Sequence, residues 1–360
     1  MNIVKATKRY EQWLGKKIRL IEPDLKRKHA AMAEDSFSFL RATFYRWMQL
    51  WPELCQECVE GPEVLAVGDL HVENFGTWRD IEGRLVWGIN DFDEAWLLPY
   101  TVDLVRLGAS AHLAIKSARL RIEAKDACDA ILAGYQEGLT AGGRAFVLEE
   151  HHAWLRSMVT GVLRDPQHYW AKLDALAAEP RVAASARKAI EKLLPAKGLS
   201  YRVVHRIAGL GSLGRERYVA IAEFDGGAIA REAKALAPSG AAWARGLKSA
   251  PIHYERALTR SVRSPDPFVH MKGFWIVRRL APDCSRVELA SMPKERDETR
   301  LLRSMGFETA NVHLGSPKAA REILKDLRAR PRLWLHRAST AMVEATVRDW
   351  ETWRAKTKSR

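Results

Sequence analysis

The hydrophobic pattern divides the first third of the chain into helical and extended segments. Over residues 4–50 apolar residues recur at spacings of three and four, which predicts helices. Between residues 62 and 95 the apolar runs shorten to two strands, EVLAVGDL and GRLVWGIND, with a DIEG turn at 80–83 between extended pieces. The next segment, TVDLVRLGASAHLAIKSARL, is apolar on most faces, so we expect a buried helix.

The later part of the chain alternates between strands and helices. Residues 120–195 have a helical composition and end at PAKG, a predicted linker. Two turns, GLGSLG and DGG, join three predicted strands: YRVVHRIAG, RERYVAIAEF and AIAREAKAL. Further on we expect a helix, IHYERALTRSV, two more strands, FWIVRRLA and SRVELA, and then helices to the end. This order predicts an α+β fold in which a small antiparallel sheet is inserted between helical parts.

Composition narrows the class of protein. The chain has 360 residues, 47% of them hydrophobic, which suits two lobes with buried cores. The net charge is +14, but basic residues are spread among acidic neighbours and never form a run of five. This favours an anionic small-molecule substrate over nucleic acid.

Neither a secreted nor a membrane protein is indicated. The first residues lack the apolar core of a signal peptide, and no apolar run reaches the length of a membrane span. Four cysteines suggest a reducing compartment, and we expect a cytoplasmic protein. Cys55 and Cys58 form a CxxC without a second close pair, which favours two reduced thiols over a four-ligand zinc site.

An acidic cluster surrounds the two predicted strands of residues 62–95. In GDLHVENFG, Asp69 and Asn74 have the DxxxxN spacing of the kinase catalytic loop, where the Asp accepts the substrate hydroxyl proton and the Asn binds Mg²⁺. In INDFDEA, Asp91 follows a strand and could bind the same metal, with Asp93 as a further candidate ligand. Oxygen ligands of this kind predict Mg²⁺.

The turn GLGSLG matches a glycine-rich phosphate-binding pattern. Gly209, Gly211 and Gly214 fit GxGxxG, and the alternating segment that follows predicts a strand rather than the helix of a Rossmann fold. A glycine loop between antiparallel strands is how kinases cover nucleotide phosphates, with Ser212 at the tip of the loop. An ordinary glycine-rich hairpin turn is the alternative.

A kinase-type lobe also needs a cation for the phosphates. The next strand offers Arg231 and Lys234, which have opposite parity, so at most one points inward. Glu255 in the following helix could pair with whichever residue is used. A solvent-exposed charged run, REAK, explains the same residues without a ligand.

Two further interpretations of the acidic cluster remain. GDxH, with His71, also opens the site of dinuclear metallophosphatases, but the later blocks are missing and ANVH at 310–313 is a poor substitute. A capped and salt-bridged turn without metal is the structural alternative. In the kinase interpretation, His71 supports the loop by hydrogen bonding.

Taken together, these motifs resemble a known family. VGDLHVENFG, INDFDEA, PYTVDLVRLGASAHLA and GLGSLG resemble the bacterial "domain of unknown function 2252" family over roughly residues 30–350. The first three also resemble the aminoglycoside phosphotransferase and choline kinase branch of the kinase-like superfamily. That resemblance implies that Asp69 is the catalytic base, that Asn74 and Asp91 bind the metal, and that Asp103 braces the loop.

The order of the motifs departs from that of kinases. The catalytic loop precedes the glycine loop by about 140 residues, and Val67 replaces the usual His. RLLRSMGFETANVHL resembles the helix that normally leads into the catalytic loop. We therefore expect a circularly permuted, kinase-like two-lobe fold. Its parts are a helical lobe with the catalytic loop and metal-strand hairpin (1–197), an antiparallel nucleotide lobe (198–292) and C-terminal helices that pack back on the helical lobe (293–360).

The expected activity is phosphoryl transfer from ATP, with Mg²⁺, to a small molecule. Adenylyl transfer would use the same cleft with the nucleotide reversed. Because the resemblance aligns Arg231 with the kinase lysine, a catalytically weak or inactive nucleotide-binding protein is an alternative. A metallophosphatase is a further alternative.

Overall fold

The computed structural model describes residues 1–149, 151–160, 165–284, 286–289, 293, 297–316 and 318–358. It is a mixed α+β structure with antiparallel sheets, which confirms the predicted class. The helices are α1 (Ile3–Gly15), α2 (Glu22–Glu34), α3 (Ser36–Ala42), α4 (Phe44–Leu54), α5 (Gln56–Val59), α6 (Tyr100–Lys116), α7 (Ala124–Ala141), α8 (Ala153–Thr160), α9 (Pro166–Asp174), α10 (Ala184–Glu191), α11 (Gly240–Ala244), α12 (Tyr254–Arg260), α13 (Glu298–His313), α14 (Ala319–Ala329) and α15 (Trp334–Lys358). The strands are β1 (Glu63–Ala66), β2 (Phe75–Arg79), β3 (Leu85–Ile89), β4 (Trp96–Pro99), β5 (Phe146–Val147), β6 (Arg202–His205), β7 (Arg217–Phe224), β8 (Gly227–Ala235), β9 (His270–Lys272) and β10 (Trp275–Leu280).

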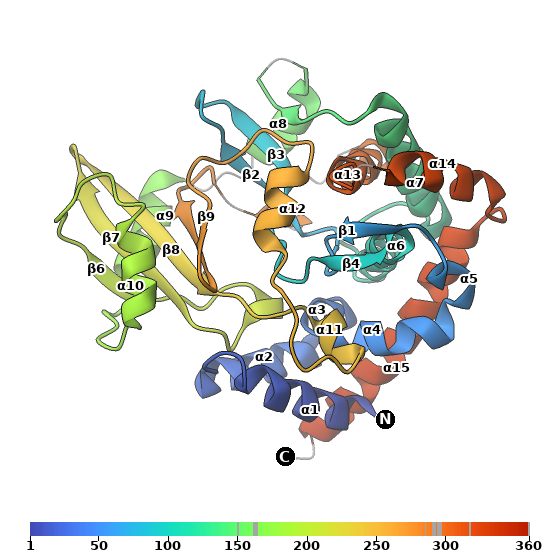
Figure 1. The fold of residues 1–360 in the computed structure, drawn as a ribbon, viewed down its shortest axis with the longest axis horizontal. Coiled ribbons are helices and arrows are strands. Elements are labelled where there is room, and N and C mark those ends of the chain that lie inside the picture. The colour runs from blue at the N-terminus through green and yellow to red at the C-terminus, as the bar shows by residue number, and fades with distance from the viewer. Residues whose placement is uncertain are drawn as a thin grey trace.

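A five-stranded antiparallel sheet forms one side of the molecule (Figure 1). Its order is β6-β7-β8-β10-β9. Successive strand residues face opposite sides, so Val203 packs with α10 while Val204 packs with α9. These two helices lie before residue 197, whereas the sheet itself begins after it, at Arg202.

The remaining strands belong to two small sheets among the helices. β1 pairs with β4, and β2 pairs with β3, which in turn pairs with β5. The predicted DIEG turn lies between β2 and β3, with Gly83 at a φ of 75° that favours glycine. Pairing of Phe75 with Ile89 brings the start of β2 beside the end of β3. This hairpin therefore places Asn74 and Asp91, which flank it, at one end.

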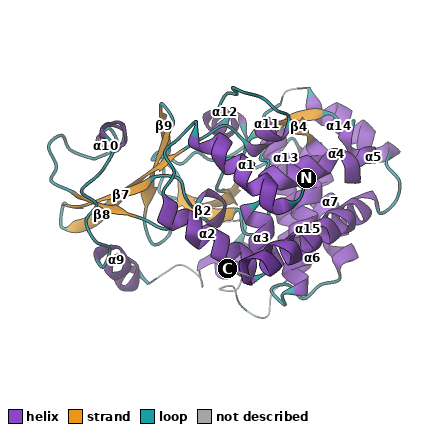
Figure 2. Ribbon diagram, turned by 90° about the horizontal axis from the view of Figure 1, so that it is seen from below, coloured by secondary structure: helices purple, strands orange, loops and turns teal. Residues whose placement is uncertain are grey.

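Four helices, α6, α7, α13 and α15, pack together beneath these strands. From Tyr100 to Ala114 every residue of α6 is buried, as its apolar sequence predicts. α13 packs closely along α7, and α15 runs beside α6. Figure 2 shows α15 extended along the face of the helical part that also carries α1.

The two ends of the described chain lie near each other (Figure 1). Ile3 of α1 and Trp353 of α15 belong to one buried cluster, which also contains Met32 and Phe39. α1 and α15 are in direct contact. In the part of the chain that the structure describes, no helix combines the length and the apolar character that crossing a bilayer requires.

Two details of the predicted sheet differ. The edge strand β9 was not predicted, because only three residues, His270–Lys272, pair with β10. The predicted strand SRVELA is represented by an isolated bridge between Arg286 and Gly76, while its residues 285 and 290 lie outside the described residues.

Candidate functional site

A cavity of about 920 Å³ lies where the five-stranded sheet meets the helical part. Its lining combines the catalytic-loop motif, the Asp91 motif, the glycine turn and α12. Of the residues singled out in the sequence, the cavity is lined by Asp69, His71, Asn74, Asp91, Asp93, Gly209, Gly211, Ser212 and Glu255. Motifs that are about 140 residues apart in sequence thus share one cavity.

The catalytic-loop motif is held from below by α6 and α13. Asp103 accepts hydrogen bonds from the backbone N–H groups of Val67 (2.7 Å) and Gly68 (2.8 Å). His313 Nε2 lies 2.9 Å from the same carboxylate, and Tyr135 Oη lies 2.8 Å from His313 Nδ1. Because all these groups are buried, this network fixes the backbone at the end of β1.

Asp69 is fixed by a buried arginine. Arg106, one turn after Asp103 on α6, donates to Asp69 Oδ1 from both Nε and Nη2. The other oxygen, Oδ2, faces the glycine turn, since a Cβ on Gly211 would lie 3.4 Å from it. Burial raises the pKa of Asp69, and the Arg106 charge opposes that shift.

Asn74, His71 and Glu73, the remaining polar residues of this motif, each have a hydrogen-bond or ion-pair partner. Asn74 Nδ2 donates to the backbone carbonyls of Asp69 (3.2 Å) and Asp91 (3.1 Å), and within the described part of the chain its side-chain oxygen accepts no hydrogen bond. His71 Nδ1 accepts from the Glu73 N–H at 3.2 Å, and burial lowers the pKa of His71 well below its ordinary value. Glu73 pairs with Arg41 at 2.7 Å.

Asp91 and Asp93 share one ammonium group. Lys234 Nζ lies 3.1 Å from Asp91 Oδ2 and 2.6 Å from Asp93 Oδ1. Burial acts to raise the pKa of Asp91, but the Lys234 charge outweighs it and holds that pKa below its ordinary value. Burial and the neighbouring Asp91 charge raise the pKa of Asp93 to about 6. Asp93 therefore takes up a proton at a higher pH than an ordinary carboxyl group does.

Strand β8 separates the two candidate cations. Lys234 points to the cavity side of the sheet and reaches Asp91, whereas Arg231 points to the side covered by α10. There, Arg231 Nε donates to the Leu193 carbonyl (2.9 Å), and its guanidinium lies over the ring of Phe268. Arg231, the residue that the family resemblance aligned with the kinase lysine, thus faces away from the acidic cluster.

Glu255 and Ser212 have different positions from those expected. Glu255 lines the cavity, but among the described ion pairs Lys234 contacts Asp91 and Asp93 instead. Ser212 lies in a single 3₁₀ turn rather than at an exposed tip, and its Oγ accepts a 2.7 Å hydrogen bond from Arg217 Nη2. These two residues therefore do not have the contacts that the kinase pattern predicts.

The glycine turn joins β6 to β7 and packs against the N-terminal helices. Gly209 and Gly214 have φ values of 74° and 93°, which require glycine. A Cβ at Gly214 would lie 2.4 Å from Leu25 Cδ2, so the absence of a side chain allows the turn to reach α2. Lys28 of α2 donates to the Gly211 carbonyl at 2.8 Å, which fixes the turn over Asp69.

Sequence reasoning missed a buried charge cluster beside the cavity. Glu232, completely buried, pairs with Arg206 (2.5 Å), Arg217 (3.0 Å) and Arg278 (2.8 Å). Although burial opposes it, these three charges hold the pKa of Glu232 well below its ordinary value. The sequence does contain one indication of this cluster. Glu232 and Lys234 are two residues apart on β8, so both side chains point to the same side of the strand, the cavity side. The arginines could not have been assigned, because they come from three other segments.

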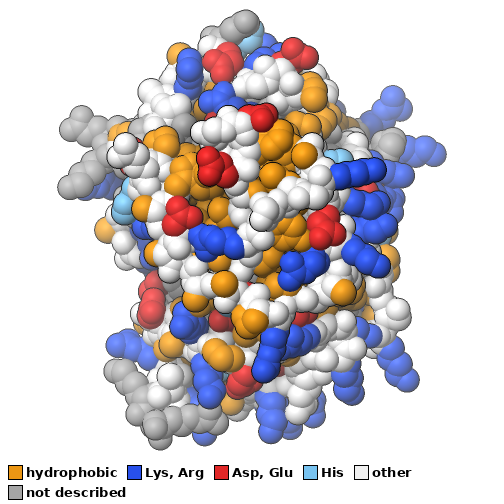
Figure 3. Space-filling view, turned by 90° about the vertical axis from the view of Figure 1, so that its left-hand side faces the viewer, with side chains coloured by type: hydrophobic (Ala, Val, Ile, Leu, Met, Phe, Trp, Pro, Cys, Tyr) orange, Lys and Arg blue, Asp and Glu red, His pale blue; other side chains and the backbone are white. Residues whose placement is uncertain are grey.

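A surface view of the end that carries the sheet shows how charge is distributed (Figure 3). Apolar side chains form a band, and Lys and Arg surround it with Asp and Glu among them. The positive charge on this face is therefore mixed with negative charge, as the spread of basic residues in the sequence indicates.

Comparison with known proteins gives one similarity, in the first half of the chain. Neither a curated protein nor a solved structure gives a match. Residues 20–168, which carry the catalytic-loop motif, the Asp91 motif and α6, match an uncharacterized protein family conserved in bacteria. The matching model is that of the domain of unknown function 2252 family, which the motifs in this part of the chain also resemble.

Proposed function

We propose that this protein is a kinase-like phosphotransferase that uses Mg²⁺ and ATP to phosphorylate a small molecule. One observation carries the proposal: Gly211 and Asp91 line the same cavity, with Asp69 between the glycine turn and α6. Phosphoryl transfer depends mainly on positioning and on electrostatic stabilisation of the transferring group. A cavity with a fixed carboxylate, oxygen ligands and cations suits that requirement.

The donor atoms of Asn74 and Asp91 suit Mg²⁺. The amide nitrogen of Asn74 is used by two backbone carbonyls, so its oxygen is available, and the Asp91 side chain is 41% exposed to the cavity. Both are hard oxygen ligands, which Mg²⁺ prefers. When bound, Mg²⁺ would neutralise phosphate charge and orient the phosphates. Asp93, buried and paired with Lys234, would support Asp91 rather than replace it.

Asp69 would orient the acceptor of the phosphoryl group. Oδ1 of Asp69 is hydrogen-bonded to Arg106, and Oδ2 faces the cavity. Oδ2 would therefore be the oxygen that takes the proton from the substrate hydroxyl or amino group. The raised pKa of Asp69 suits a group that takes a proton during the reaction. Asp103 and His313 would act as positioning residues, because they fix the loop without reaching the cavity lining.

Lys234 is the better candidate for holding phosphates. It is 2% exposed, faces the acidic cluster and lies on a strand directly after the glycine turn hairpin. Arg217 and Arg278, whose charges line the cavity, would add positive potential for the phosphates. The Gly209–Gly214 turn would cover the phosphates.

The arrangement of termini supports a circularly permuted, kinase-like two-lobe fold. α1 and α15 are in contact, and permutation joins such neighbouring ends while cutting the chain elsewhere. α13, the helix that resembles the one leading into the kinase catalytic loop, packs beside β1 and binds Asp103 through His313. In this fold the sheet β6–β10 would be the nucleotide lobe.

The metallophosphatase alternative has less support. It would use ANVH as a late ligand block, but His313 is buried and hydrogen-bonded to Asp103 and Tyr135. A catalytically inactive nucleotide-binding protein predicts the same cavity without turnover. These alternatives differ in what they predict for ATP, for hydrolysis and for the glycine turn.

Thermal unfolding with ATP tests the proposal. Mg-ATP at 100 times its Kd should stabilise the wild type by about 2.7 kcal/mol, with a smaller effect of ATP without Mg²⁺. Asp91→Ala should lose most of the Mg²⁺-dependent part. Asp174→Ala, which removes an exposed partner of Arg202 outside the cavity lining, is the matched control and should respond like the wild type.

Three outcomes separate the alternatives. An equal Mg-ATP shift in wild type and Asp91→Ala would remove Asp91 from the metal site. No shift in the wild type would contradict the proposal itself. Nucleotide stabilisation without any ADP formation over a panel of hydroxylated and amino-bearing acceptors would favour the inactive alternative.

A further inference from the structure

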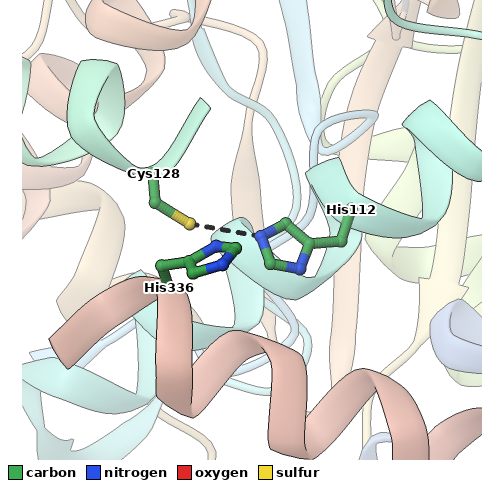
Figure 4. Close-up of side chains that lie close together, drawn as sticks. All are labelled: His112, Cys128 and His336. Atoms are coloured by element: carbon green, nitrogen blue, oxygen red, sulfur yellow. Dashed lines mark hydrogen bonds between the residues drawn. The ribbon is translucent and has the colours of Figure 1, made fainter. Parts of the chain in front are cut away.

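A second cluster of metal-binding side chains lies away from the cavity. His112 of α6, Cys128 of α7 and His336 of α15 converge from three helices (Figure 4). One ligand atom from each lies within 4.8 Å of the others. Among the described residues this is the one group of three or more such side chains.

We infer that His112, Cys128 and His336 form a binding site for Zn²⁺, distinct from the proposed Mg²⁺ site. One thiolate and two imidazoles are ligands that select a borderline or soft transition ion over Mg²⁺. All three residues are absent from the lining of the large cavity. The site would therefore be independent of the proposed reaction.

The geometry is close to that of tetrahedral zinc. Zn–S and Zn–N bonds of about 2.3 and 2.0–2.1 Å place sulfur and nitrogen ligands roughly 3.6 Å apart. Cys128 Sγ and His112 Nε2 are already 3.4 Å apart. The other distances between the three ligand atoms are at most 4.8 Å. Side-chain adjustments of about 1 Å, without movement of a helix, would bring these atoms to bonding distance of one ion.

The hydrogen bonds around the three side chains are consistent with an ion site. His336 Nδ1 is buried without a hydrogen-bond partner among the described residues, which is costly for a polar atom. The His112 ring is also hydrogen-bonded to the backbone of Ala124, the type of contact that orients metal-binding histidines. With no fourth side chain of these types in the group, a water or an external ligand would complete the coordination.

Metal binding here would join three helices that support the cavity. α6 carries Asp103 and Arg106, and α15 packs along α6. A bound ion would therefore stabilise the folded state and fix α6 against α7 and α15.

Cobalt titration of the metal-free, full-length protein tests the site. Co²⁺ replaces Zn²⁺ and reports a thiolate ligand through a charge-transfer band in the near ultraviolet. We expect one equivalent of Co²⁺ to give this band in the wild type, Zn²⁺ to displace it and excess Mg²⁺ to leave it unchanged. Cys128→Ser should remove the band, and His336→Ala should weaken Co²⁺ binding by at least about tenfold, since even supporting residues contribute that much.

The control variants identify the source of any signal. The double variant Cys55→Ser/Cys58→Ser removes the CxxC thiols, which are both buried and free, and should keep the band. Asp91→Ala should also keep it. His336 is only partly buried, so His336→Ala tests the site even where Cys128→Ser fails to fold. Absence of the band in the wild type, equal binding by His336→Ala, loss in the CxxC variant or displacement by Mg²⁺ would each overturn the assignment.

Discussion

Lys234 Nζ lies 3.1 Å from Asp91 Oδ2, and the same ammonium is 2.6 Å from Asp93. This contact connects the sheet to the acidic cluster and distinguishes Lys234 from Arg231, which lies on the other side of β8. Lys234→Met should therefore abolish stabilisation by Mg-ATP in thermal unfolding. Arg231→Met is the matched control, because Arg231 lies on the other side of the strand, and it should keep the nucleotide effect.

Lys234→Met should also be less stable than the wild type in the absence of nucleotide. Removing one partner of a buried ion pair costs about 3–5 kcal/mol, but Asp91 is 41% exposed, so we expect about 1–3 kcal/mol. Urea unfolding measures this cost. If Arg231→Met rather than Lys234→Met lost the response to Mg-ATP, the assignment of the phosphate cation would be wrong.

Replacement of Asp103 tests the support of the catalytic-loop motif. Asp103 accepts from Val67 N, Gly68 N and His313, whereas an Asn side chain would direct its NH₂ at one of these donors. Because a buried unsatisfied donor costs about 1–3 kcal/mol, Asp103→Asn should lower the free energy of unfolding by about 3 kcal/mol. Tryptophan fluorescence in urea gives the value.

An exposed aspartate supplies the control for this variant. Asp129 pairs with Lys125 on the surface of α7, and Asp129→Asn should change stability by less than about 0.5 kcal/mol. A comparable loss in both variants would show that the Asp103 network contributes nothing beyond an ordinary surface charge.

The close contact of α7 and α13 depends on glycine. A Cβ at Gly306 would lie 2.0 Å from the Ile131 carbonyl oxygen, and one at Gly134 would lie 1.7 Å from that of Arg303. Since the clashing atoms are backbone, Gly306→Ala should force the helices apart and cost about 3 kcal/mol or more. Calorimetry or urea unfolding would measure the loss.

Gly15 is the control for the helix contact. It ends α1, and a Cβ there would make an ordinary 3.4 Å contact with Leu20. Gly15→Ala should be neutral or stabilise the protein by up to about 1 kcal/mol. Destabilisation of the same size in both variants would contradict the proposed backbone clash.

Local patterns were sufficient where neighbouring residues determine the structure. The DIEG turn was predicted because it separates two short apolar runs, and the positive φ of Gly83 fits it. α6 was predicted because its sequence is apolar on nearly every face. The DIEG turn allows β2 to pair with β3, and this pairing places Asn74 beside Asp91. This part of the candidate site therefore follows from short-range sequence information.

Long-range contacts were not predictable in the same way. The spacing of Arg231 and Lys234 on β8 predicts that their side chains point to opposite sides of the strand. Which of the two sides faces the cavity depends on α10, which covers the other side of the sheet. The contact of His313 with Asp103 joins residues 210 positions apart, and Arg206, Arg217 and Arg278 reach Glu232 from three segments. Such contacts depend on the packing of whole elements, which no single spacing in the sequence encodes.

Glu308 should make stability depend on pH near neutrality. It lies on α13, accepts hydrogen bonds from Ile89 N (3.1 Å) and Asn311 Nδ2 (2.7 Å), and is 2% exposed. Burial raises the pKa of Glu308 from 4.5 to about 7, although the nearby Arg263 charge acts to lower it. In the folded protein the carboxyl group therefore holds its proton at pH values where the unfolded chain has lost it. Stability should fall as the pH rises from about 4.5 to about 7 and then stay level, with a total loss of up to about 3 kcal/mol from this group.

Comparison with Glu308→Gln isolates this contribution, because the other titrating groups are common to both proteins. The amide cannot ionise, so the free energy of unfolding of Glu308→Gln relative to that of the wild type should increase between pH 5 and pH 8. Urea unfolding of both proteins at pH 5, 6, 7 and 8 measures the difference. Gln has one acceptor oxygen where Glu has two, so the substitution itself lowers the free energy of unfolding. Because this loss is the same at every pH, it shifts the curve of stability against pH without changing its slope. Two parallel curves over this range would mean that Glu308 is ionised in the folded protein at pH 5 and that the raised pKa is wrong.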